Sequence, residues 1–118
     1  MTMVAAADIS SQDELESMRE TFGEDFSMLA ELYLADSPKR IAALREAAAG
    51  GDAAQAARVA HSLGGSSASI GAPALAAQCL ALEQDCRNGA LDKLSQQLQN
   101  IETAYKHLET KIRGMLQA

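Results

Sequence analysis

The chain has 118 residues, of which 47% are hydrophobic but only 3% aromatic, and its formal net charge is −6. This length is enough for one domain with a modest core. An acidic chain without a basic stripe repels phosphate backbones, which argues against nucleic-acid binding. No apolar run approaches the roughly 18 residues that span a bilayer, and no secretory signal begins the chain. We therefore expect a cytoplasmic protein that binds neither nucleic acid nor membrane.

The N-terminal part predicts a loose end followed by a short helix. Residues 1–10 show no clear hydrophobic period, so we expect a flexible N-terminus and a domain over residues 11–118. Ser11 and Glu14 fit a capping box that starts a helix from about Gln12 to Phe22. Gly23 then interrupts the helical pattern.

A long helix is predicted from about Glu24 to Ala49. Pro38 lies in its middle and should kink it, because proline removes one backbone hydrogen bond of the helix. Gly50-Gly51-Asp52 supplies the end of this helix and the cap of the next one. The residues predicted to face the core are Phe26, Leu29, Leu32, Tyr33, Ile41, Leu44 and Ala48.

Three more helices are predicted, over about 53–69, 73–87 and 91–116, separated by Gly71-Ala72-Pro73 and by Asn88-Gly89. Cys79 and Cys86 lie seven residues apart on one helix, too far to pair, and are predicted to be core thiols. The other predicted inward residues are Leu75, Leu82, Leu94, Leu98, Ile101, Tyr105, Leu108 and Ile112. The sequence thus predicts an all-α fold, an antiparallel up-down-up-down four-helix bundle with a short extra N-terminal helix.

His61 is the most informative residue. Val59, Leu63, Ser66 and Ile70 form the predicted buried stripe of its helix, and His61 lies nearly opposite this stripe. Its predicted neighbours on the outer face are all glycine or alanine: Ala57, Gly64, Gly65 and Ala68. Each glycine costs the helix roughly 1 kcal/mol relative to alanine. The pattern predicts an exposed imidazole on a smooth patch that another protein's backbone can approach.

The chemistry open to such a histidine is limited. A metal ligand needs His, Cys or carboxylate companions, and the positions three and four residues away hold Ala57, Arg58, Gly64 and Gly65. Helix spacing suggests no catalytic dyad or triad around it. A nucleophile needs only a neutral ring nitrogen and an electrophile that can reach it. Phosphoryl transfer fits best, because a docking partner can bring the phosphoryl group and its metal ion.

These residues carry a family resemblance. The run His61-Ser62-Leu63-x-Gly65-Ser66-Ser67-x-x-Ile70-Gly71-Ala72, followed by Leu75, Cys79, Leu82-Glu83 and Arg87, resembles the histidine-containing phosphotransfer (HPt) domain of two-component phosphorelays. Phe22-Gly23-x-Asp25 and Gly51-Asp52 resemble the upstream half of that family, so the likeness covers roughly residues 12–115.

The resemblance implies a role for each of several residues. His61 would accept the phosphoryl group, and Gly65 would let a receiver domain approach. Glu83 occupies a position that often carries a polar side chain near the histidine, although an ordinary surface ion pair is the other interpretation of this residue. Arg58 and Arg87 would lie near the docking surface, or would be generic surface charges.

The implied partners are receiver domains of response regulators or of a hybrid histidine kinase, in cytoplasmic, bacterial two-component signalling. The implied Mg²⁺ is held by the receiver, and this chain would bind no metal or cofactor of its own. We expect a monomer that forms a phosphohistidine intermediate rather than an independent enzyme.

One position departs from the family pattern. The family usually places lysine three residues after the histidine, where this chain has Gly64. The missing cation predicts that transfer depends more on the partner's metal and lysine, with Arg58 as a partial replacement. Two functions stay open: a phosphocarrier between receiver domains, and a divergent HPt domain that binds or sequesters a receiver with little transfer.

Overall fold

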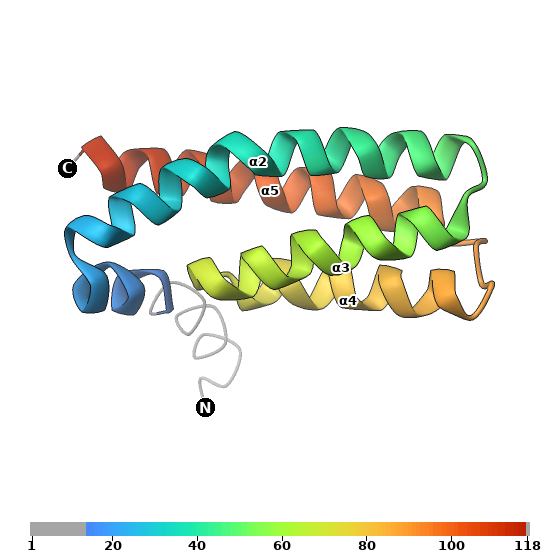
Figure 1. The fold of residues 1–118 in the computed structure, drawn as a ribbon, viewed down its shortest axis with the longest axis horizontal. Helices are drawn as coiled ribbons and strands as arrows, with labels where there is room; N and C mark the ends of the chain where they lie inside the picture. Colours follow the sequence, from blue (N-terminus) through green and yellow to red (C-terminus); the bar gives the residue numbers. More distant parts are fainter. Residues whose placement is uncertain (1–13, 118) are drawn as a thin grey trace, which may run out of the picture.

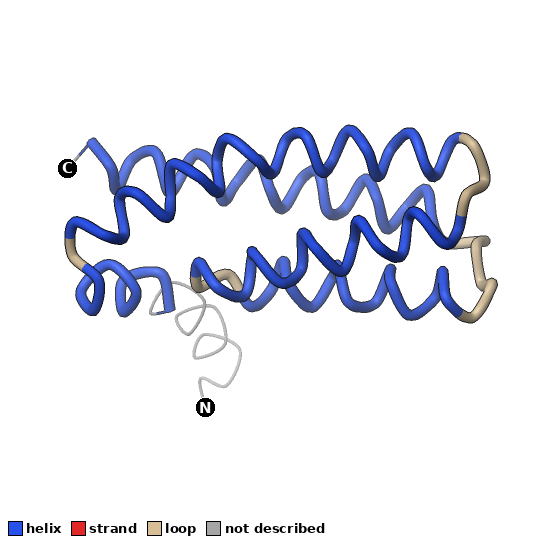
Figure 2. Tube along the Cα trace, in the orientation of Figure 1, coloured by secondary structure: helices blue, strands red, loops and turns tan. Residues whose placement is uncertain are grey.

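The computed structural model describes residues 14–117, and every regular element in that range is a helix (Figure 2). Residues 14–22 are helical, and Gly23 turns the chain with φ of 53°. Four longer helices follow: α2 (Glu24–Ala49), α3 (Ala53–Ile70), α4 (Pro73–Arg87) and α5 (Leu94–Gln117). The predicted flexible segment 1–10 and the predicted capping residue Ser11 lie outside the described residues.

The four long helices run alternately in opposite directions (Figure 1). Helices α2 and α5 lie side by side, and α3 and α4 form the second pair, so each helix contacts two others around the bundle. The most extensive contact joins α3 to α4. This arrangement confirms the predicted antiparallel up-down-up-down four-helix bundle with a short extra N-terminal helix.

Helix boundaries follow the capping residues of the sequence. The Asp52 side chain accepts a hydrogen bond from the Gln55 amide at 3.1 Å and so caps α3. Gly71 ends α3 in the left-handed conformation, with φ of 96°. A Cβ there would lie 2.9 Å from Met18 Cγ, so Gly71 also lets the helical segment 14–22 lie against the α3–α4 turn. Pro73 occupies the first turn of α4, where its missing N–H costs no helical bond.

Two predictions about the long helices have different outcomes. Helix α2 is continuous across Pro38, and its axis changes direction along its length, as the prediction of one kinked helix required (Figure 1). The predicted start of the last helix at Leu91 is wrong, because α5 begins at Leu94. Residues 91–93 form a turn that carries the chain from α4 to α5, and the first α-helical hydrogen bond there runs from Gln97 N to Lys93 O at 2.9 Å.

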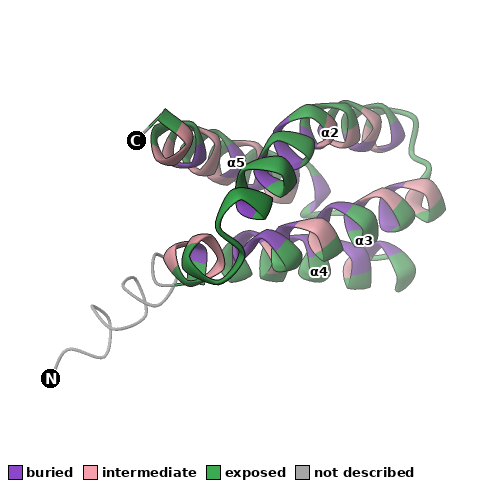
Figure 3. Ribbon diagram, turned by 60° about the vertical axis from the view of Figure 1, so that its left-hand side comes forward, coloured by how far each residue is buried: buried purple, intermediate pink, exposed green. Residues whose placement is uncertain are grey.

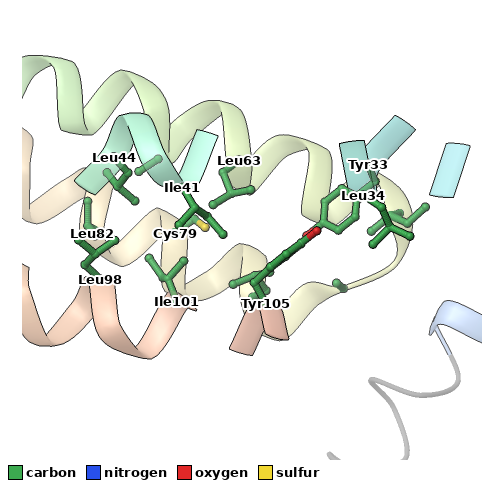
Figure 4. Close-up of a cluster of buried hydrophobic side chains, with 14 of the residues drawn as sticks. Tyr33, Leu34, Ile41, Leu44, Leu63, Cys79, Leu82, Leu98, Ile101 and Tyr105 are labelled. Atoms are coloured by element: carbon green, nitrogen blue, oxygen red, sulfur yellow. The ribbon is translucent and has the colours of Figure 1, made fainter. Parts of the chain in front are cut away.

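The core fills the space between the two helix pairs (Figures 3 and 4). Aliphatic side chains from all four long helices meet there, together with the two tyrosines, whose ring centroids lie 6.0 Å apart. Both cysteines are free and buried, as predicted, and burial raises the pKa of the Cys79 thiol to about 12. The largest fully buried hydrophobic residues are Phe26, Leu44, Leu63, Leu82, Ile101 and Ile112.

The inward face of the first half of α2 differs from the prediction. Leu29 and Leu32 are exposed, and the buried positions in this part of the helix are Phe26, Ala30, Tyr33, Leu34 and Ser37. The small side chain of Ala30, which is fully buried, marks the contact line with the rest of the bundle. The two leucines therefore fall to one side of this line, beside a hollow between α2 and α3.

Candidate functional site: His61 and its neighbours on α3 and α4

Helix α3 presents His61 to solvent. Its side chain is 73% exposed, while Ala60 and Leu63 on either side of it in the sequence are fully buried. The buried residues of α3 anchor the helix between α2 and α4, and the imidazole projects from the remaining arc. The predicted exposure of His61 is confirmed.

The ring of His61 has a partner from the neighbouring helix. Its Nδ1 atom lies 3.1 Å from Oε1 and 3.2 Å from Oε2 of Glu83, a residue of α4 that is 22 positions away in the sequence. Arg87 donates a hydrogen bond from Nε to Oε2 of the same carboxylate at 3.0 Å. Glu83 itself is only 8% exposed. One nearly buried carboxylate therefore links the exposed histidine to an exposed arginine.

Glu83 is held in its ionised form. Its burial by itself raises the pKa, but the hydrogen bonds from His61 and Arg87 outweigh burial and bring the pKa of this carboxyl below its ordinary value. The carboxylate consequently carries its negative charge at neutral pH and acts only as an acceptor.

Beside His61 lies an apolar hollow between α3 and α4. Apart from the ring itself and Glu83, its walls are small or aliphatic. Leu80, half exposed, stands at its rim. The remaining lining residues are Ala60, Gly64, Gly65, Ala68 and Ala76. The smooth surface predicted around His61 is thus present, and it continues onto α4.

The two glycines after His61 have different structural roles. A Cβ on Gly64 would lie 3.1 Å from the Cβ of Cys79 and 3.6 Å from the Ala76 carbonyl oxygen, so Gly64 faces α4 rather than solvent. A Cβ on Gly65 would meet no atom within 4 Å. A side chain at position 64 would therefore crowd the contact between α3 and α4, whereas an added Cβ at position 65 would meet open space.

Two details of the predicted helix faces are wrong. Ala57, predicted on the outer face beside His61, is fully buried. Ser66, predicted in the buried stripe, is only half buried, while Ser67 is fully buried and shares a hydrogen bond of 2.7 Å with the Tyr33 hydroxyl. Val59 is half buried and packs against the core, in agreement with the prediction. The reason for the two differences is that α3 packs against two helices. Its buried face is therefore wider than the predicted stripe and has a different centre from it.

The two arginines assigned to the docking surface lie on opposite sides of His61. Arg87 joins the site through Glu83. Arg58 turns toward α2 and donates two hydrogen bonds, at 3.1 and 2.7 Å, to the amide oxygen of Gln55. It lines a hollow between α2 and α3, so it does not take the place of the lysine that Gly64 replaces.

The family resemblance suggested a polar side chain at Glu83 near His61, but the spacing of residues along the helices did not indicate this contact. Helix spacing was applied to residues near His61 in the chain, and Glu83 reaches the ring from another helix. A signal was present, because Glu83 directly follows Leu82 and lies four positions after Cys79, both of which are fully buried. An acidic residue next to a buried stripe needs a polar partner, and His61 and Arg87 are those partners.

The comparisons with known proteins agree with this geometry. The family model of the Hpt domain matches residues 28–117, which is more than half of the chain. A solved structure of histidine-containing phosphotransfer protein B (HptB) from Pseudomonas aeruginosa PAO1 is similar, with a TM-score of 0.83 and 28% sequence identity. The match covers 89% of this chain and 91% of that one. A search of curated proteins gives no significant match. With its exposed histidine on α3 of an antiparallel bundle, this chain belongs to the Hpt domain family, the histidine-containing carriers of phosphorelays.

Proposed function

We propose that this chain accepts a phosphoryl group on Nε2 of His61 from the aspartyl phosphate of one receiver domain and passes it to the aspartate of another. The observation that supports this proposal most strongly is the contact between Nδ1 of His61 and the ionised Glu83 carboxylate, on a ring that is 73% exposed.

The contact selects the tautomer of the neutral ring. An ionised carboxylate has no hydrogen to donate, so Nδ1 of His61 is the donor and carries the hydrogen toward Glu83. The lone pair of a neutral imidazole then resides on Nε2. This nitrogen makes no hydrogen bond to any described residue, and it is the nucleophile of the proposed reaction.

The transfer balances without a further reactant. The Nε2 lone pair forms a bond to phosphorus while the bond between phosphorus and the aspartate oxygen breaks, and the aspartate leaves as a carboxylate. The ring becomes positively charged as this bond forms. Glu83, 3.1 Å from Nδ1, stabilises that charge, and its own charge is fixed in place before the reaction begins. Reversal of the same step returns the phosphoryl group to a second receiver.

The cations around the phosphoryl group come mainly from the partner in this proposal. Gly64 supplies no positive charge, and Arg58 lines the hollow between α3 and α2. Arg87 uses Nε to hold Glu83, which leaves the remaining N–H groups of its guanidinium for other acceptors. We propose that Mg²⁺ and a lysine of the receiver supply the remaining charge, so this chain contributes the nucleophile and the docking surface.

The docking surface of the proposal includes one hollow on each side of α3. On the α4 side, Gly65 and Ala68 leave the ring accessible, and Leu80 offers an apolar contact. On the α2 side, the exposed Leu29 and Leu32 offer a second apolar contact. A partner that covers both would enclose His61 and exclude water from the reacting groups.

A phosphate-transfer experiment tests the proposal. A receiver domain carrying a radiolabelled aspartyl phosphate is incubated with Mg²⁺ and the wild-type chain, and with the variants His61→Gln and His107→Gln. His107 is also exposed but lies on α5, so its variant is the matched control. The proposal predicts an acid-labile, base-stable label on the wild type and on His107→Gln, and none on His61→Gln.

The alternative function is a receiver-binding or sequestering module with little transfer, and the missing lysine at position 64 is the observation that favours it. It predicts that the wild type binds receivers but takes no label from any of them. Binding without label in the same experiment therefore supports the alternative and contradicts the carrier.

The setting of the carrier is part of the proposal. No helix among the described residues is long and apolar enough to cross a membrane. We propose that the chain acts in the cytoplasm as a monomer, because the receivers that it would serve act there and a monomer leaves the His61 face open. Size-exclusion chromatography with light scattering tests the oligomeric state, and a dimer that buries His61 would contradict it.

A further inference from the structure

A cluster of positive charge lies on the α2 side of His61. Lys39 and Arg40 of α2 and Arg58 of α3 line one hollow between the two helices. We call these three residues the basic patch. They are three of only ten basic residues in a chain whose net charge is −6, so their grouping runs against the overall charge.

The ion pairing of the arginines sets the basic patch apart. The chain has six arginines, and four of them lie within 4 Å of a carboxylate among the described residues. The pairs are Arg19–Glu16, Arg45–Glu102, Arg87–Glu83 and Arg113–Glu109. The two arginines without such a partner in residues 14–117 are Arg40 and Arg58, and both belong to the basic patch.

The groups around the basic patch do not neutralise its positive charge. Arg58 is oriented by two hydrogen bonds to Gln55, whose amide is neutral. Asp52, at the start of α3, is engaged as the helix cap. Asp36 lies one turn before Arg40 and lines the adjoining hollow, but it forms no ion pair with Arg40. Three like charges held together repel one another, so the isolated molecule gains no stability from this grouping.

The position of the basic patch connects it to the candidate site. Ser62, which directly follows His61, lines the same hollow as Lys39, Arg40 and Arg58. Glu83 lies on the other side of the ring, in the hollow between α3 and α4. A protein that docks on His61 and extends toward α2 therefore meets the positive charge at once.

We propose that the basic patch docks an acidic surface of the receiver domain next to the receiver's phospho-accepting aspartate. This inference rests on the proposed function. It specifies that the receiver covers the α2 side of His61 and that electrostatic attraction guides it there. Charge at the rim of an interface acts mainly on the association rate and on its salt dependence. The basic patch is thus a steering surface for receivers, and the surrounding acidic chain repels anionic partners that approach elsewhere.

The test compares two triple variants that remove the same charge. Lys39→Gln/Arg40→Gln/Arg58→Gln neutralises the basic patch. Lys93→Gln/Lys106→Gln/Lys111→Gln neutralises three lysines far from it in the sequence, one in the turn before α5 and two on α5. The probes are receiver domains from the same genome, activated with beryllofluoride as an analogue of the aspartyl phosphate. Stopped-flow association is measured from about 25 mM to about 500 mM salt, a range over which screening becomes strong. Unfolding by urea is measured for both variants.

The proposal predicts that the patch variant associates about 10-fold more slowly than the wild type at low salt, and that the difference shrinks as salt rises. The α5 variant should associate like the wild type, and the patch variant should be at least as stable as the wild type. Equal rates for all three proteins at every salt concentration would overturn the proposal. A loss of stability in the patch variant that accounts for its slower binding would also overturn the proposal. Binding of the wild type to duplex DNA or anionic vesicles in place of receivers would do the same.

Failure of the inference is distinguishable from failure of the proposed function. If the wild type takes the phosphoryl label but associates like the patch variant at every salt concentration, the carrier function is supported and the steering surface is contradicted. If the wild type binds receivers faster than the patch variant but takes no label, the steering surface is supported and the carrier function is contradicted. Wild-type protein that binds no receiver of the panel contradicts both.

Discussion

The carboxylate of Glu83 and the imidazole of His61 face each other across the contact between α4 and α3, at 3.1 and 3.2 Å. Glu83 is nearly buried and His61 is mostly exposed, so the carboxylate orients the ring without shielding it from solvent. The pairing links fold stability to the protonation of Glu83, and this link can be measured.

The stability contributed by Glu83 should depend on pH in one direction. Because the folded-state pKa of Glu83 lies below its ordinary value, its contribution is complete above the unfolded value of about 4.3 and is lost as pH falls through the lower folded value. Glu83→Gln should therefore cost about 1 kcal/mol of unfolding free energy at neutral pH. Urea denaturation from neutral pH down to about pH 3 should show this difference shrinking only below about pH 4.3. A difference that stays constant to pH 3 would contradict the assignment.

The two glycines after His61 should respond oppositely to alanine. Gly65→Ala adds a methyl group in open space, and should raise stability by up to about 1 kcal/mol because alanine favours the helix. Gly64→Ala places its methyl 3.1 Å from Cys79 Cβ, and should lower stability by about 1 kcal/mol or more as α3 and α4 separate.

Thermal and urea unfolding of both glycine variants check this contrast, and phosphotransfer measured alongside adds a functional readout. Gly65→Ala should slow transfer from a receiver despite its higher stability, because the added methyl stands where the partner approaches. Gly65→Ala protein with unchanged transfer would show that the partner does not come close at this position.

The hydrogen bond between Tyr33 and Ser67 should contribute measurably to the α2–α3 contact. Its two oxygens lie 2.7 Å apart in the core, and either single change leaves one of them without its partner. Tyr33→Phe and Ser67→Ala should each cost about 1–3 kcal/mol of unfolding free energy. The double variant should cost less than the sum of the two, and strict additivity would show that the bond is not formed in solution.

The sequence predicted the architecture well because its helices are separated by strong local signals. Glycine, proline and capping residues set the starts and ends of α2, α3 and α4 to within a residue. The predicted start of α5 was too early, because Leu91 and Lys93 favour a helix by propensity but lie in the turn before it. Local propensity does not reveal how far a chain must travel before the next helix can pack.

The candidate site was predicted in part. The exposure of His61 followed from the periodicity of its own helix, and Gly65 and Ala68 were placed correctly beside it. Gly64 also lines the hollow beside His61, although it faces α4. Ala57 was placed on the wrong face, because a single-helix projection does not show that α3 packs against two neighbours. The Glu83 contact and the grouping of Arg58 with α2 both depend on the way helices pair, which no spacing within one helix encodes.

The most direct measurement locates the phosphorus atom on the ring. The wild-type chain is labelled with ¹⁵N in histidine, phosphorylated by a receiver with Mg²⁺, and studied by ³¹P and ¹⁵N NMR, with the shifts assigned through His61→Gln. The account predicts that phosphorus is bonded to Nε2 of His61 and that Nδ1 retains its hydrogen toward Glu83. Phosphorus on Nδ1, or on any residue other than His61, would contradict it.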